Sequence, residues 1–500
     1  MDLFAGLLTG FQAAATASNL LYCLVGTFVG TLIGVLPGLG PAATVAMLMP
    51  TAFLLPPLSS LIMLAGIYYG AQYGGSTTSI LVNLPGEASS IVTALDGYQM
   101  ALKGRAGPAL ATAAIASFSA GTVATLIIAL FAPPLAEVAL KFGAPEYFAL
   151  MALGLVASVV LARGSLLKAI GMILTGLLIG LVGTDINSGV RRFTFGFNEL
   201  SDGIGFVTVA MGMFGMGEII RNLEKGSGER KIIGKITSLM PSKDEFKRIV
   251  APILRGTFIG SFLGILPGGG ALLASFASYS IEKKISKHGK EFGTGAIEGV
   301  AAPEAANNAG AQTSFIPMLT LGIPTSPVMA LMIGAMVIQG LQPGPSMIGD
   351  QPQLFWGIIA SMWIGNLMLL VLNLPLVGIW VKLCLVPYRF LYPAILIFCG
   401  IGVFSLSNSP FDVLLMAIFG IAGYLFEKVE LETAPLLLAL ILGPMMEEHL
   451  RRAMKLSRGD PSIFLRRPIS LAVLIIAALA LLIAVLPSIK AKREEAFQED

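Results

Sequence analysis

Charged residues are scarce in this sequence. Only 12% of its 500 residues are Asp, Glu, Lys or Arg, against about 25% in soluble domains. No charged residue occurs from Leu3 to Gly86, and a bilayer is spanned by only about 20 apolar residues. A soluble globular protein is therefore excluded. Because the apolar runs are continuous rather than alternating, a β-barrel is rejected as well. The predicted fold class is an all-α polytopic membrane protein embedded in a lipid bilayer.

Cysteine and histidine are also rare. The three cysteines, Cys23, Cys384 and Cys399, lie far apart in apolar segments without a CxxC pair. Disulfides, a metal site and a bound cofactor are therefore poorly supported. The two histidines, His288 and His449, neighbour basic residues, which favours solvated positions at helix ends. We predict no metal site and no catalytic residue.

Motifs of soluble enzymes are missing. There is no Walker motif, so this chain does not hydrolyse ATP, and GLGPAA after Pro37 matches a dinucleotide pattern without the strand that should precede it. The net charge of +3 gives no indication of a nucleic-acid partner. The N-terminus has no basic segment, so a cleaved signal peptide is not expected.

A duplication organises what is present. Gly26–Gly40 reads GTFVGTLIGVLPGLG and Gly256–Gly270 reads GTFIGSFLGILPGGG, identical at 9 of 15 positions. We divide the chain into a first half (1–220, motif 26–108), a basic connection (221–255), a second half (256–386, motif 256–345) and C-terminal helices with a tail (387–500). About 10–12 transmembrane helices are expected.

Basic loops indicate how the halves are oriented. Lys and Arg flank the second copy on both sides, at Arg221–Arg255 and Lys283–Lys290, whereas the first copy has no charged flank. Since basic loops usually face the cytoplasm, the second copy is expected to enter and return as a re-entrant hairpin. The first copy is then expected to enter from the other side. This is an inverted-topology repeat with broken helices, the architecture of many secondary transporters.

The Pro-Gly tips of both copies are the first candidate site. Backbone without helical hydrogen bonds is tolerated at membrane depth only where protein or a water-filled cavity satisfies it, and free amides near glycine suit an anion. The alternative is helix packing through small residues, which we favour for the glycines of Gly26–Gly34 and Gly256–Gly264. The substrate-binding candidates at the tips are Pro37, Gly38, Gly40, Pro267, Gly268, Gly269 and Gly270.

Each half also contains a second interrupted element, Gly74–Gly86 and Gln312–Pro327. Both combine hydroxyl and amide side chains with Gly and Pro, a set that suits a carboxylate or a bare Na⁺. Hydrogen bonding between helices is the alternative role for these hydroxyls. The substrate-binding candidates here are Gly75, Ser76, Thr77, Thr78, Asn83, Thr325 and Ser326.

Glu304 is the strongest candidate for a coupling-ion site. In APEAANNAG it shares one helical face with Asn307 and Asn308, and ionisable residues in apolar segments are functional candidates. We add Thr320 to this set. The alternative is an interfacial helix, and Glu87 and Asp96 are expected to be interfacial.

The sequence resembles a known family at these residues. GTLIGVLPGLGPAAT, YYGAQYGGSTTSILVNLPGE, LDGYQMALKGRAGPAL, GILPGGG, APEAANNAG, PMLTLGIPTSPV and GLQPGP are similar to the large membrane subunit of the tripartite tricarboxylate transporter family (TctA-type). The resemblance implies a secondary importer of carboxylates in the bacterial inner membrane, coupled to Na⁺ or H⁺ and elevator-like. It further implies a small membrane subunit and a periplasmic solute-binding protein as partners, and a homo-oligomer is possible.

Other functions remain open. A carboxylate channel or exporter, or a secondary carrier without a binding protein, would use a similar scaffold. An intramembrane enzyme would need a catalytic pair such as Glu304 with His288.

Overall fold

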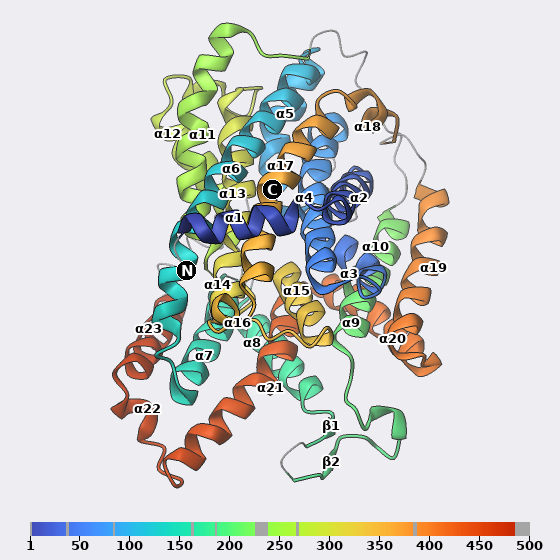
Figure 1. Ribbon diagram of the computed structural model, residues 1–500. Helices are drawn as coiled ribbons and strands as arrows, with labels where there is room; N and C mark the ends of the chain where they lie inside the picture. Colours follow the sequence, from blue (N-terminus) through green and yellow to red (C-terminus); the bar gives the residue numbers. More distant parts are fainter. Residues whose placement is uncertain are drawn as a thin grey trace.

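A computed structural model of the chain describes residues 3–36, 40–83, 86–161, 165–185, 188–225, 239–266, 270–383 and 388–485. These ranges are almost entirely helical (Figure 1). Four helices among them are long and apolar enough to cross a membrane: α2 (Ala17–Gly34), α6 (Ala106–Ala139), α17 (Pro352–Asn373) and α20 (Pro410–Lys428). Shorter apolar helices accompany them, and the predicted all-α polytopic class is confirmed.

The first half begins with α1 (Leu3–Ala14), α2, α3 (Pro41–Ala52), α4 (Pro57–Val82), η1 (Ala88–Ser90), α5 (Ile91–Leu102) and α6. It continues with α7 (Ala144–Leu161), α8 (Leu166–Gly180), β1 (Gly183–Thr184), β2 (Arg191–Arg192), η2 (Asn198–Leu200), α9 (Phe206–Ala210), the π-helical η3 (Met211–Met216) and α10 (Gly217–Lys225).

The second half consists of α11 (Lys243–Gly264), α12 (Gly270–Ile285), η4 (Gly289–Glu291), α13 (Glu298–Thr313), α14 (Phe315–Leu321), α15 (Pro327–Ile338), α16 (Met347–Asp350), α17 and α18 (Val377–Leu383). The C-terminal part holds α19 (Tyr388–Ser407), α20, α21 (Thr433–Leu456), α22 (Ile463–Arg466) and α23 (Pro468–Val485).

The glycines of the two copies pack one helix directly onto the next, as predicted. In the first half, a β-carbon on Gly26, Gly30 or Gly34 of α2 would lie 2.3, 2.4 and 2.5 Å from the carbonyl oxygens of Met63, Ile67 and Ala71 on α4. In the second half, one on Gly256, Gly260 or Gly264 of α11 would lie 2.3, 2.2 and 2.4 Å from those of Ala302, Ala306 and Gly310 on α13. Only glycine permits these close approaches. The duplication in the sequence is thus a duplication of a packed helix pair.

The same register continues to the end of α4 in the first half and to the end of α14, which follows α13, in the second half. The offset of 239 residues that relates Met63 to Ala302 also relates Asn83 to Gly322. Both residues are left-handed C-caps, with φ of 54° and 68°, and a proline follows each two residues later. Helix α5 and helix α15 then correspond, since both have 12 residues and end at a left-handed glycine, Gly104 and Gly340.

Two helices extend further than the expected segments. The first half was expected to break from Gly74 onward, but α4 is continuous from Pro57 to Val82. Gly74 is helical because it packs against the backbone of Gly34 and Val35 rather than forming a turn. The basic connection was expected to reach residue 255, yet α11 begins at Lys243, where Ser242 and Glu245 form a capping box.

The second copy forms an antiparallel helical hairpin. Arg255 on α11 pairs with Glu282 on α12, and a β-carbon on Gly270 would lie 2.9 Å from the α-carbon of Gly264 near the tip. Helix α3, which follows the first tip, instead lies mainly along α4. The two halves also interlock, since α13 packs against α6, α17 against α4 and α6, α3 against α15, and α12 against η1.

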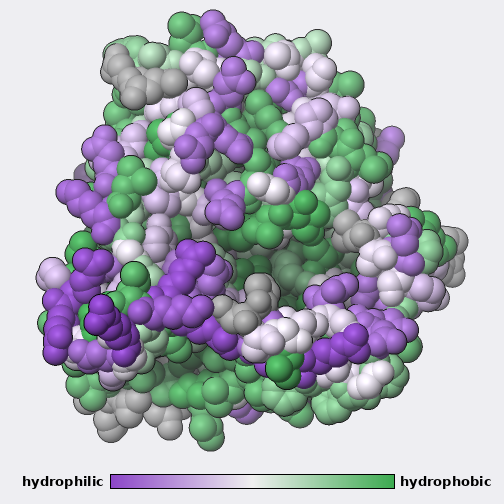
Figure 2. Space-filling view, turned by 60° about the horizontal axis from the view of Figure 1, so that its bottom comes forward, coloured by the Kyte–Doolittle hydropathy of each residue, from purple (hydrophilic) through white to green (hydrophobic). Residues whose placement is uncertain are grey.

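A second group of helices lies at the other end of the molecule from α11 and α12 (Figure 1). Here α21 packs between α7 and α8, and α23 lies against α7. The β1–β2 hairpin extends from this end and is held to α21 by Arg192–Glu447 and Arg451–Asp185 ion pairs of 2.9 and 2.8 Å. Figure 2 shows this end, where a band of hydrophilic side chains borders a hollow with largely hydrophobic walls.

Candidate functional site

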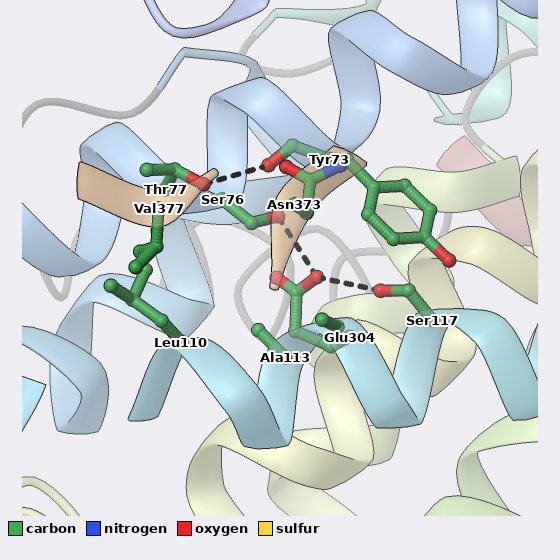
Figure 3. A pocket seen from close by; sticks show the side chains of 10 residues that line it. Tyr73, Ser76, Thr77, Leu110, Ala113, Ser117, Glu304, Asn373 and Val377 are labelled. Carbon is green, nitrogen blue, oxygen red and sulfur yellow. Dashed lines mark hydrogen bonds between the residues drawn. The ribbon is translucent and has the colours of Figure 1, made fainter. Parts of the chain in front are cut away.

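The carboxylate of Glu304 lies where the two halves cross, and it is fully buried. Its Oε2 accepts hydrogen bonds from Ser76 on α4 at 2.8 Å and from Ser117 on α6 at 3.3 Å. Its Oε1 accepts one from Thr93 on α5. Glu304 on α13 therefore joins the second half to three helices of the first, and Figure 3 shows its contacts with Ser76 and Ser117.

A small cavity of about 20 Å³ borders this carboxylate. That volume is enough for one water-sized particle, which needs about 10–15 Å³. Its polar lining includes Tyr73, Ser76 and Thr77 on α4, together with Ser117, Glu304 and Asn373. Figure 3 shows these side chains arranged around one space, with Asn373 at the end of α17.

A second buried carboxylate, Glu87, lies beside the first. Asn307 donates to Glu87 Oε1 at 2.7 Å and accepts from Ser89 at 3.0 Å. With its amide nitrogen turned toward Glu87, Gln72 donates to the same carboxylate at 2.7 Å. Since Asn307 and Glu304 are neighbours on one face of α13, the predicted Glu304–Asn307 face exists, and it continues into Glu87.

Asn308 completes the network on the other side. Its Nδ2 donates to Ser117 Oγ at 2.7 Å and to the carbonyl of Glu304 at 3.0 Å. Ser117 thus receives one hydrogen bond and donates another to the carboxylate. Thr320, the fourth coupling-ion candidate, lies about four turns further along the chain and donates to Ile316 O within α14. The structure does not bring Thr320 to the cluster.

Glu87 and Asp96, expected at the membrane interface, both have buried side chains. Asp96 Oδ1 accepts from the backbone amides of Gly293, Gly295 and Ala296 at 2.7–2.9 Å, and Oδ2 accepts from Tyr279 at 2.9 Å. These donors satisfy a charge that would otherwise be costly to bury. Asp96 is therefore an anchor between α5 and the second half.

The substrate-binding candidates of the first half divide into two groups. Ser76 and Thr77 line the cavity, whereas Thr78 donates back to Gly75 O at 2.9 Å within α4. Gly75 packs against Gly86 and Glu87 at the end of the broken element. Asn83 is the exposed left-handed C-cap of α4.

In the second half, Thr325 and Ser326 lie in the connection between α14 and α15. Thr325 is buried, and its Oγ1 has no partner among the described residues. Ser326 caps α15 by accepting from Met329 N at 3.3 Å. Gly40, at the start of α3, lies nearest to Gly86. The candidates Pro37, Gly38, Pro267, Gly268 and Gly269 lie outside the described residues, and Gly270 begins α12.

Comparison with known proteins identifies the family. The sequence profile of the tripartite tricarboxylate transporter TctA family matches residues 20–438. That range contains both glycine stripes and every residue of the Glu304 and Glu87 clusters. The chain belongs to the TctA family.

Two relatives from Agrobacterium vitis are similar to this TctA-family chain. An uncharacterized 52.8 kDa protein in the TAR-I ttuC' 3'region is 60% identical over 500 residues, with both chains fully covered. An uncharacterized protein in the TAR-II ttuC' 3'region is 61% identical over 241 residues, which is 48% of this chain and all of the relative. No solved structure matches.

Carboxylates at the α11–α12 end of this TctA-family protein differ from the central pair in having arginine partners. Arg248 binds Glu298 through Nε and Nη2 at 2.7 and 2.8 Å, and Arg255 binds Glu282 at 2.8 and 2.6 Å. Arg248 also donates to the exposed Glu291, and this hydrogen bond lowers the pKa of Glu291 below its usual value.

The pairing of Glu304 with His288 that an enzyme would need is not observed. The His288 ring contacts Glu291 at 3.1 Å and is exposed, whereas the carboxylate of Glu304 is enclosed by serine and threonine hydroxyls. A transporter family is consistent with this separation.

Sequence reasoning missed several residues of this TctA-family site. They are Gln72, Tyr73, Glu87, Thr93, Ser117 and Asn373. Glu87 could have been found, because it directly follows the interrupted stretch NLPG. Ser117 and Asn373 lie in ordinary apolar helices. The crossing of the two halves brings Ser117 to Glu304, and the position of α17 brings Asn373 to the same cavity.

Proposed function

We propose that this chain is the large membrane subunit of a binding-protein-dependent secondary transporter that imports tricarboxylates or related carboxylates. Import is driven by a Na⁺ or H⁺ gradient. The proposal rests chiefly on membership of the TctA family over residues 20–438. It is supported by a buried carboxylate, Glu304, at the crossing of two repeated halves.

The substrate site is proposed between the breaks rather than in the Glu304 cavity. A cavity of about 20 Å³ is far below the roughly 300 Å³ of ordinary ligand pockets, and a substrate carboxylate would repel Glu304. Each helix that follows a Pro-Gly tip packs against the element that directly follows the interrupted stretch of the other half, α3 against α15 and α12 against η1. Backbone amides, Thr325 and Ser326 at these junctions would bind the anion.

The remaining features are part of the same proposal. The halves are related by inverted topology, and the α11–α12 hairpin is re-entrant from the cytoplasm. The chain resides in a bacterial inner membrane with a small membrane subunit, and a periplasmic solute-binding protein delivers the ligand. Alternating access is elevator-type, with the interlocked halves moving against the outer helices.

Uptake by reconstituted protein tests this function. Proteoliposomes containing this chain and its small membrane subunit receive the loaded binding protein and a panel of ¹⁴C-labelled mono-, di- and tricarboxylates. We expect accumulation of at least one carboxylate only when the binding protein and a Na⁺ or H⁺ gradient are both present. Equilibration without accumulation would indicate a channel, and uptake without the binding protein would indicate an independent carrier.

A further inference from the structure

The two central carboxylates lack the partners that buried charges normally have. In the described ranges, no Lys, Arg or His side chain pairs with Glu304 or Glu87, whereas Glu282 and Glu298 are each held by an arginine. A charged side chain at membrane depth needs a counter-charge or a proton. Hydroxyl and amide donors stabilise the carboxylate but leave its negative charge uncompensated.

The cavity beside Glu304 has the lining that a bare cation requires. Four of the residues that line it, Glu304, Ser76, Ser117 and Thr77, carry side-chain oxygens, and hard cations are bound by oxygen ligands. Asn373 contributes a fifth side chain with an oxygen atom. Its Nδ2 is used in a 2.8 Å hydrogen bond to Leu369 O, while its Oδ1 has no hydrogen-bond partner among the described residues, although the side chain is only 8% exposed.

We propose that this cavity is a Na⁺ site, with Glu304 and Asn373 as its distinguishing ligands. The proposal rests on the proposed transport function, for which it names the coupling ion and its position. One carboxylate among neutral oxygens matches a single positive charge, whereas divalent sites use more carboxylates. A proton alone would require neither the space nor the unpaired amide oxygen of Asn373.

The arrangement also explains how the ion would act on the protein. Ser76 and Thr77 belong to α4 and Ser117 to α6, while Glu304 lies on α13 and Asn373 on the last turn of α17. Na⁺ would therefore bind ligands from both halves at once. Its binding favours the arrangement in which these helices are packed together as one unit. Ser76 and Thr77, which the sequence assigned to the substrate, would then serve the cation.

Equilibrium binding of ²²Na⁺ to the purified full-length protein tests the site. Asn373→Ala and Ser117→Ala are expected to weaken Na⁺ binding about tenfold or more, and Glu304→Gln to abolish it. Ser361→Ala is the matched control, because Ser361 is a buried residue of α17 whose hydroxyl bonds only Ile358 O at 2.7 Å in the described structure. Its affinity should equal that of the unmodified protein.

Melting temperatures in NaCl, KCl and choline chloride at constant ionic strength provide a second measurement that needs no transport. Saturable stabilisation by Na⁺ alone, lost in Asn373→Ala, supports the site. Equal Na⁺ affinity in Asn373→Ala and Ser361→Ala overturns it, as does the absence of Na⁺ binding. Carboxylate uptake driven by H⁺ and indifferent to Na⁺ would overturn the Na⁺ site while leaving the transport function intact. Na⁺ binding without any carboxylate uptake would overturn the function instead.

Discussion

Ser76 on α4 donates a 2.8 Å hydrogen bond to Glu304 on α13, and both side chains are buried. These residues are 228 positions apart in the sequence and belong to different copies of the duplication. The contact fixes the crossing point of the two halves at the polar cavity. Any relative movement of α4 and α13 must break it, so the ion site and the packing of the halves are coupled.

Replacing Ser76 with Ala should weaken this coupling without unfolding the protein. The substitution removes one hydrogen bond to a charged group, worth about 1.5–3 kcal/mol, and one cavity oxygen. We expect the Na⁺ concentration for half-maximal uptake to rise about tenfold. Thr175→Ala is the control, because Thr175 is half-buried on α8, away from the cavity, and its hydroxyl bonds Gly171 O. An unchanged Na⁺ dependence in Ser76→Ala would show that Ser76 is not a ligand.

The glycine stripes should be intolerant of even one added methyl group. Gly30→Ala and Gly260→Ala place a β-carbon 2.4 and 2.2 Å from carbonyl oxygens of the facing helix. Overpacking of this kind costs about 1–3 kcal/mol, so both variants should melt at lower temperature than the unmodified protein. Gly171→Ala is the matched control, since no atom of a neighbouring element lies within 4 Å of its added β-carbon. Equal melting temperatures for all three variants would contradict the close packing.

Asp96 should be essential for anchoring α5 to the second half. Asp96→Ala leaves three backbone amides without their acceptor. The amide of Ala296 is buried, and an unsatisfied buried donor costs about 1–3 kcal/mol. We expect much faster amide hydrogen exchange over residues 293–296. Asp96→Asn retains an acceptor oxygen, so its exchange rates should lie between those of the unmodified protein and those of Asp96→Ala. Unchanged protection in Asp96→Ala would show that other contacts hold this segment.

The ion pair of Arg248 and Glu291 predicts that the thermal stability of the protein depends on pH in the acidic range. The pKa of Glu291 is lowered in the folded protein by the hydrogen bond from Arg248. Its stabilising contribution is therefore fully present above the pKa of the unfolded state, about 4.3. The contribution is lost as the pH falls through the lower pKa of the folded state. The difference in melting temperature between the unmodified protein and Glu291→Gln should be constant above about pH 5.5 and vanish on acidification. A difference that persists at low pH would show that Glu291 acts through packing instead.

Much of this architecture could be predicted from the sequence. The near-identity of Gly26–Gly40 and Gly256–Gly270 indicated a duplication, because glycine and proline constrain the backbone at fixed positions. The spacing of Glu304 and Asn307 indicated a common helical face. Both inferences concern local geometry within one helix or one repeat, where residue spacing determines which side chains share a surface.

The errors came from contacts between segments that are distant in sequence. Gly74 suggested a turn, yet its lack of a side chain serves the approach of α2 to α4. Burial of Glu87 and Asp96 was not expected because charged residues usually avoid the interior, but donors from the second half satisfy both. Asn373 carries no local signal at all, since its role follows from the position of α17 beside Glu304.

Accumulation of a carboxylate by Glu304→Gln provides the most direct test of the central claim. Proteoliposomes with the small membrane subunit and the loaded binding protein are given an inward Na⁺ gradient, and internal labelled carboxylate is followed to steady state. The unmodified protein should concentrate the carboxylate above the external level. Glu304→Gln should lose this accumulation by about 100-fold, equivalent to about 3 kcal/mol for the loss of a buried charge interaction. Accumulation by Glu304→Gln to the same level as the unmodified protein would contradict the account.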